Sequence, residues 1–207
     1  MTCLTPAERA PAQPSRLTTA SGSCNWASAF SGSPRKRPKA LSKRHCRPAT
    51  AHIDTAAANR NGTAVGAALV GSGIPREELF VTTKVRTGEP GLVHDNLQHS
   101  RAALGLDYVD LYLIHGPVES AGLAPAGWKA MEELYAAGLT RAIGVSNLMA
   151  DYLDRLLAEA VVVPAVNQIE IRPTFQQQAL VAKSRCWALR LGRATPRAGT
   201  PTLVTAR

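Results

Sequence analysis

Five apolar, strand-like runs of this chain end on polar side chains, and three of these side chains are able to exchange a proton. The terminal residues are Asp54, Lys84, His115, Asn147 and Gln168. The steps from Asp54 to Lys84, from Lys84 to His115 and from His115 to Ser146 are 30, 31 and 31 residues, and the step to Gln168 is 22. A carboxylate, an ammonium group and an imidazole on one rim could carry out acid–base chemistry.

The spacing of about 30 residues is typical of one strand, loop, helix and loop of a βαβ unit. Parallel strands that are buried on both sides read as continuous apolar runs, and the loops at their C-terminal ends meet on one rim. Helices are expected between the runs, where apolar residues recur at helical spacing, at 63–70, 95–104, 126–137 and 151–160. The pattern predicts an α/β protein with a parallel sheet over about 51–182, and alternation alone fits a barrel or a doubly wound sheet.

The two ends of the chain differ in composition from its middle. Residues 1–50 carry a net charge of +8 and residues 183–207 a net charge of +6, which leaves −5 of the overall +9 for the segment between them. All four cysteines lie in the ends, without metal-ligand spacing: Cys3, Cys24, Cys46 and Cys186. We expect no metal site, no secretory signal and no membrane span, and hence reduced thiols in a cytoplasmic protein.

The first fifty residues lack sustained apolar periodicity, so we expect them to be a disordered basic segment, and 183–207 a basic tail. The basic run at 35–44 is also compatible with nucleic-acid binding, but no aromatic residues are interleaved with it. A solvated tail is the favoured interpretation, and no specific nucleic-acid partner is expected.

Five segments together resemble the aldo-keto reductase family, in particular its bacterial branch similar to 2,5-diketo-gluconate reductase. They are 52–56, 73–84, 105–115, 141–147 and 163–170, in the order of the family. The resemblance implies a (β/α)8 TIM barrel, with about strands two to six recognisable in 51–182. It also implies transfer of a hydride from NADPH to a small aldehyde or ketone substrate, with protonation of its oxygen.

The resemblance also assigns roles to residues of this chain. Asp54 and Lys84 match the ion pair that assists the catalytic acid, and His115 matches the histidine that orients the substrate carbonyl. Asp54 is counted among the cofactor-binding residues as well, beside those that match the hydrogen-bonding partners of the nicotinamide carboxamide, namely Ser146, Asn147 and Gln168.

Two departures from the family pattern limit what the resemblance implies. The position of the family's acidic tyrosine holds Asn59, and that of a following glutamate holds Gly62. An amide does not ionise near neutral pH, so the general acid is missing. Tyr108 and Tyr112 are expected within a buried strand before His115, and Tyr135 and Tyr152 within helices, so none is an obvious substitute. Family-like sequence also stops near residues 51 and 182, without the first strand and the last two.

The composition of the two ends suggests coding sequence read out of frame, and genuine tails are the weaker alternative. We expect the open edges of an incomplete barrel to favour aggregation or self-association. Three functions are compatible with the sequence: an NADPH-dependent carbonyl reductase of impaired activity, a catalytically inactive remnant of one, and, as the least favoured, a basic nucleic-acid-binding protein.

Overall fold

The computed structural model describes residues 51–86, 90–115, 124–171, 173–186 and 189–194, and within them strands and helices alternate. The strands are β1 (Ala51–Asp54), β2 (Leu79–Val85), β3 (Leu111–His115), β4 (Ile143–Ser146), β5 (Val166–Glu170) and β6 (Arg190–Ala194). The α-helices are α2 (Gly62–Ser72), α3 (Pro90–Leu104), α4 (Ala124–Ala136), α5 (Ala150–Glu159) and α6 (Gln178–Cys186). Two short 3-10 helices, η4 (Ala57–Asn59) and η5 (Arg76–Glu78), precede α2 and β2.

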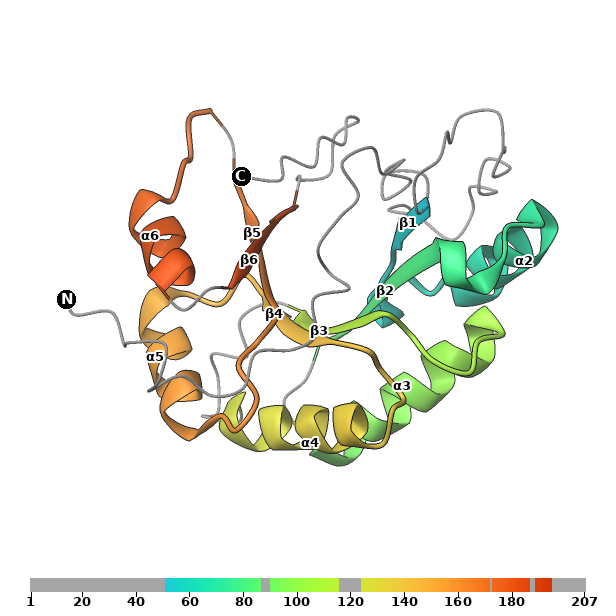
Figure 1. Ribbon diagram of the computed structural model, residues 1–207, viewed down its shortest axis with the longest axis horizontal. Coiled ribbons are helices and arrows are strands. Elements are labelled where there is room, and N and C mark those ends of the chain that lie inside the picture. The colour runs from blue at the N-terminus through green and yellow to red at the C-terminus, as the bar shows by residue number, and fades with distance from the viewer. Residues whose placement is uncertain (1–50, 87–89, 116–123, 172, 187–188, 195–207) are drawn as a thin grey trace.

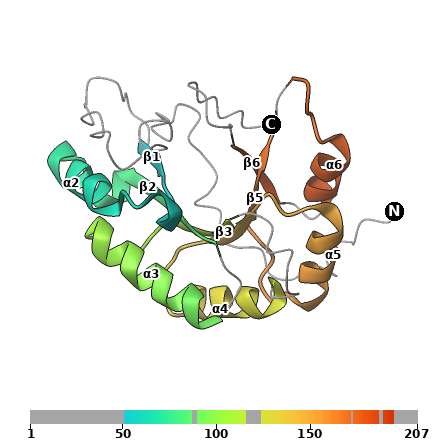
Figure 2. The same cartoon turned by 180° about the vertical axis from the view of Figure 1, so that it is seen from behind.

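The strand order decides between the two architectures that the sequence pattern left open. Each strand pairs in parallel with the next one along the chain, from β1 to β6, and the order never reverses. A doubly wound sheet has a point where the strand order reverses, whereas a barrel does not. Figures 1 and 2 show the sheet as a curved arc, with α2 to α6 following one another along its convex side. The described residues therefore form an incomplete (β/α)8 barrel.

The two faces of the sheet belong to two separate apolar clusters. Toward the helices, the strand residues Ile53, Val81 and Val145 belong to a large cluster that includes Trp128 of α4. A smaller cluster on the concave face contains Leu111, Leu113, Ala142 and Val166. Successive strand residues point to opposite faces, so residues two apart point to the same face. His115 therefore lies on the concave side, with Leu111 and Leu113. Alternation along each strand thus sets which polar residues face the interior of the barrel.

Helices α2 to α5 confirm the four helices expected from the sequence, with small shifts at their ends, whereas α6 was not among them. The largest shift is in α3, which was expected from residue 95 and begins five residues earlier, at Pro90. Proline suits this first position, because the first amides of a helix have no intrahelical acceptor. Helix α2 ends before Gly73, whose φ of 59° lies in the left-handed region that glycine adopts without strain.

The segment expected to be a basic tail contains regular structure at its start. Residues 183–186 are the last turn of α6, and Arg190–Ala194 pairs in parallel with β5 as a sixth strand. The sequence did not show this strand because arginines interrupt its short apolar run. Lys183 is buried because it pairs with Asp154 of α5, so its charge does not mark a solvated tail. The proposed disorder of 1–50 lies outside the described residues, as does the remainder of the tail.

Candidate active site

The polar residues that end the strands lie together at the C-terminal edge of the sheet. Asp54 is the last residue of β1, His115 of β3 and Ser146 of β4. Lys84 is the last residue but one of β2, and Gln168 is the last but two of β5. In the strand register His115 pairs with Ser146, and Ser146 pairs with Gln168. The shared edge that the sequence predicted for these residues is therefore present in the fold.

An ion pair between Lys84 and Asp54 occupies this edge. The Lys84 ammonium donates to Asp54 Oδ1 and, at 3.1 Å, to the backbone oxygen of Thr55. The two side chains are only 9% and 15% exposed, so the pair is shielded from water. Burial by itself would raise the pKa of Asp54, but the charge and hydrogen bond of Lys84 together with the Gln168 hydrogen bond hold this pKa below its usual value. The aspartate is thus ionised beside a fixed ammonium group.

The side chain of Gln168 reaches across the sheet from β5 to β1. Its Nε2 donates to Asp54 Oδ2 at 2.9 Å, although the residues are 114 positions apart in the sequence. The sequence analysis grouped Gln168 with the residues that bind the cofactor amide and did not predict this contact with the ion pair. The contact arises because the curvature of the sheet brings β5 within reach of β1.

Ser146, Asn147 and Gln168 form a second hydrogen-bonded group. Ser146 Oγ donates to the backbone oxygen of Gln168 at 3.0 Å, and Asn147 Nδ2 donates to Ser146 Oγ at 3.3 Å. The backbone of Asn147 lies in the left-handed region, with a φ of 54°, and its amide donates to the oxygen of Gln168 at 2.8 Å. The side-chain carbonyl oxygens of Asn147 and Gln168 remain available as acceptors, and each of these side-chain amides has one further N–H to donate. Such a set fits a carboxamide, which both donates and accepts hydrogen bonds.

His115 lies beside the ion pair as a neutral base. Burial lowers its pKa below the usual value, the charges of Lys84 and Arg86 lower it further, and Asp54 opposes them. The Nδ1 atom is buried and has no hydrogen-bond partner among the described residues. A neutral imidazole with an unused nitrogen is able to hydrogen-bond a ligand that enters the edge.

Asn59 ends the short helix η4, just after β1, and is half-buried. Its side chain makes no hydrogen bond to any residue that the structure describes. The sequence offers no obvious tyrosine to replace it, and the structure agrees for Tyr112, whose hydroxyl donates to the backbone of Val93 at 3.0 Å on the helix side of the sheet. Burial also raises the pKa of Tyr112, which makes it a poorer proton donor.

The expectation that Tyr108 lies within a strand was wrong, because β3 begins at Leu111. Its ring instead lies between the guanidinium groups of Arg76 and Arg141, at 4.0 and 4.1 Å from the ring centroid. Both arginines also pair with the buried Asp110. Tyr108 is thus held in a structural cluster away from the C-terminal edge.

One residue near the site was missed by the sequence analysis. His52 lies two positions before Asp54 and therefore on the same face of β1, with Nε2 at 3.0 Å from Thr82 Oγ1 and its ring edge-on to Phe80. Burial lowers the pKa of His52, against the opposing charge of Asp54. His52 could have been identified from the sequence, because a residue two positions before Asp54 in a strand lies on the same face as Asp54.

Within the described ranges, no helix is both long and apolar enough to cross a bilayer. The same part of the chain brings no three His, Cys, Asp or Glu side chains into an arrangement that could hold a metal ion. The polar groups at the edge of the sheet are therefore the only described constellation that combines buried charge with unused hydrogen-bonding capacity at the strand ends.

Comparison with known proteins gives consistent matches. The model of the aldo/keto reductase family matches residues 38–185. An aldo-keto reductase of Mycolicibacterium vanbaalenii is 51% identical over 132 residues, which are 63% of this chain and 47% of that protein. An aldo/keto reductase structure from Brucella melitensis superposes with a TM-score of 0.67 at 40% identity, over 70% of this chain and 57% of the other.

An aldo-keto reductase of Bombyx mori, solved in complex with NADP, superposes with a TM-score of 0.65 at 37% identity, over 70% of this chain and 52% of that one. The chain spans about half the length of the relatives it matches.

Proposed function

Because the chain belongs to the aldo-keto reductase family, we propose that its strand-end site reduces the carbonyl group of an aldehyde or ketone to an alcohol with NADPH. The observation that carries the proposal is the buried pair of Lys84 and Asp54 beside His115, at the edge where β4 and β5 present the carboxamide-binding group. The Bombyx mori relative, which is similar over 70% of this chain, is a complex with NADP.

When bound, NADPH would supply the hydride, and the residues of this chain would position the reactants and provide the proton. Ser146, Asn147 and Gln168 are the residues that would hold the nicotinamide carboxamide, through the unused donors and acceptors of their side chains. His115 donates a hydrogen bond to the carbonyl oxygen, which also excludes the substrate poses in which that oxygen points elsewhere. Asp54 and the oxygen of Thr55 fix the ammonium of Lys84 next to this position.

Proton delivery is the weak step of this site. Two of the three N–H groups of Lys84 donate to Asp54 and Thr55, which leaves one for the developing alkoxide. Asn59, at the family's acid position, cannot supply a proton. Loss of a positioned general acid lowers the rate by roughly 10²–10⁴-fold, so we expect slow turnover with Lys84 as the donor.

The test is oxidation of NADPH by the full chain with a small aldehyde and a small diketone, monitored by absorbance. Lys84→Met and His115→Ala should abolish turnover, whereas Lys129→Met, which changes an exposed lysine on α4, should not. Absence of both turnover and NADPH binding in the unmodified protein would rule the proposal out.

A second candidate, a catalytically inactive member of the family, is favoured by Asn59 at the position of the family's acid. In that case the chain would bind NADPH but give no turnover with any carbonyl compound, and Lys84→Met would leave the background rate unchanged. Turnover that depends on Lys84 would exclude this second candidate.

A further inference from the structure

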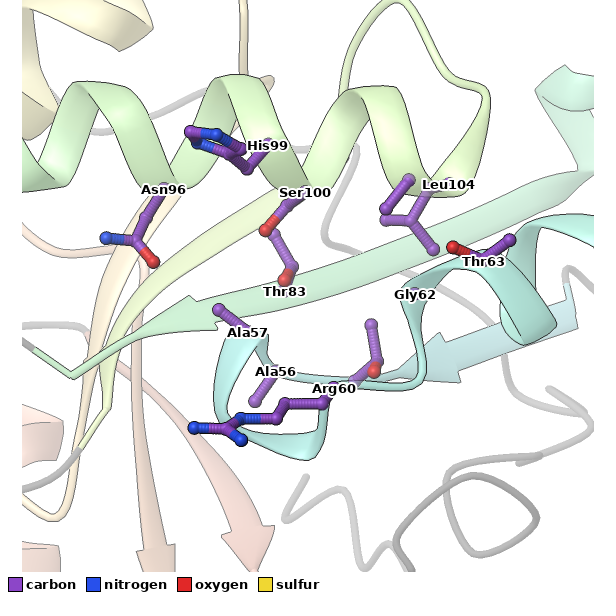
Figure 3. Close-up of a pocket in the computed structure, with 12 residues that line it drawn as sticks. Ala56, Ala57, Arg60, Gly62, Thr63, Thr83, Asn96, His99, Ser100 and Leu104 are labelled. Carbon is purple, nitrogen blue, oxygen red and sulfur yellow. The ribbon is translucent and has the colours of Figure 1, made fainter. Parts of the chain in front are cut away.

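A pocket of about 330 Å³ lies on the helix side of the sheet, between η4, the start of α2, the side of α3 and one residue of β2 (Figure 3). Its lining consists of Thr55, Ala56, Ala57, Arg60, Gly62, Thr63, Thr83, Asn96, His99, Ser100, Ala103 and Leu104. Thr83 and Lys84 are adjacent in β2 and so point to opposite faces of the sheet. The pocket is therefore separate from the strand-end site.

The pocket contains hydroxyl groups that have no partner. Thr83 is only 1% exposed, yet its hydroxyl makes no hydrogen bond to any residue that the structure describes. The same holds, within the described ranges, for the hydroxyls of Thr63 and Ser100 on the neighbouring walls. Because Thr83 lines the pocket, its hydroxyl is open to a ligand or water that fills the pocket.

A guanidinium group and an imidazole flank these hydroxyls. Figure 3 shows Arg60 and His99 on opposite sides of the pocket, one on the loop after η4 and the other on α3. Arg60 forms no ion pair with any described residue, and no aspartate or glutamate contributes to the described lining. The imidazole of His99 bonds the backbone oxygen of Asp95 through Nδ1 at 2.7 Å, which leaves Nε2 free for a ligand.

The N-terminus of α2 adds amide donors to the same space. Gly62 and Thr63 open this helix and line the pocket, and its first turn contains no acidic residue. The side chain of Asn61 does not cap the helix, and the first amide with a helical acceptor is that of Val65. The preceding amides and the helix dipole favour an anion at this end.

We propose that this pocket binds the phosphate group of a small anionic molecule. Residues with hydrogen-bond donors line the pocket from three elements, namely the start of α2, Thr83 of β2, and Ser100 and His99 of α3. A tetrahedral phosphate has enough oxygens to meet all three, whereas a planar carboxylate meets two. The volume leaves room beyond the phosphate. A small organic group of the ligand, or water, would fill this remaining space.

Titration calorimetry on the full chain without NADPH tests the proposal, with inorganic phosphate, glycerol 3-phosphate and acetate as probes at constant ionic strength. Arg60→Gln should weaken phosphate binding by about tenfold or more, and Thr83→Val, which removes a hydroxyl at constant shape, by about threefold. Ser100→Ala serves as a second hydroxyl variant in case Thr83→Val does not fold. Arg185→Gln, an exposed arginine of α6, is the matched control and should leave binding unchanged.

Saturable binding of phosphate or its ester, tighter than that of acetate and weakened by the pocket variants alone, would support the proposal. Tighter binding of the ester would assign a small phosphorylated metabolite, and tighter binding of inorganic phosphate would assign the free anion. Absence of saturable binding, equal binding of acetate, or equal loss in Arg185→Gln would overturn it. Because no reduction is measured, failure here is distinct from failure of the reductase assay.

Discussion

The buried pair of Lys84 and Asp54 makes a quantitative prediction about stability. Removing one charge leaves the other in a site where the side chains are only 9% and 15% exposed. Breaking a buried pair in this way costs about 3–5 kcal/mol, because the remaining charge has lost its compensation. We expect Asp54→Asn and Lys84→Met each to cost about 3 kcal/mol, at the lower end, because Gln168 and the oxygen of Thr55 still offer hydrogen bonds.

The double variant Asp54→Asn/Lys84→Met should be far less damaged than the two single changes suggest. Replacement of both members of a buried pair is often neutral, since the cost of desolvating both charges also disappears. We expect the double variant to lose at most about 2 kcal/mol, which makes the coupling energy of the cycle at least about 4 kcal/mol.

The assay is equilibrium unfolding in urea of all four proteins, followed by circular dichroism and by the fluorescence of tryptophan, which includes the buried Trp128. A second cycle with an exposed, unpaired lysine and acid should give no coupling. If the single losses add to within about 0.5 kcal/mol, the two groups do not interact and our account of the site is wrong.

Three further outcomes follow from the structure. Asn59→Tyr should raise kcat for carbonyl reduction by roughly 10²–10⁴-fold, and an unchanged rate in the NADPH assay would show that proton supply is not the weak step. Burial lowers the pKa of both His52 and His115 in the folded state, so the unfolded chain binds more protons as the pH falls through 6.5. Stability is therefore complete above this pH and declines below it, which urea midpoints at pH 7.5 and 5.5 would reveal, with a smaller decline in His115→Gln. Asp110→Asn should cost about 3 kcal/mol in the same unfolding assay, because Asp110 is buried and accepts from two arginines; a loss below about 1 kcal/mol would contradict this.

The sequence located helices α2 to α5 and the first five strands, but not α6, because apolar periodicity is a local signal. The run before His115 shows this well, since its continuous apolar residues mark a strand that is buried on both faces. The strand at Arg190–Ala194 was missed because its arginines break such a run, and pairing with β5 is a contact between distant segments. Tyr108 was misplaced for a similar reason, because stacking between two arginines is invisible in local periodicity.

The polar residues at the strand ends and the family resemblance were determined by the sequence alone, because residue type and spacing along βα units fix which side chains reach the shared edge. Only the tertiary structure decided how these side chains pair. The curvature of the sheet brings Gln168 to Asp54 across 114 residues, and the packing of α2 and α3 creates the pocket around Thr83. Both depend on distances between elements that no local pattern encodes.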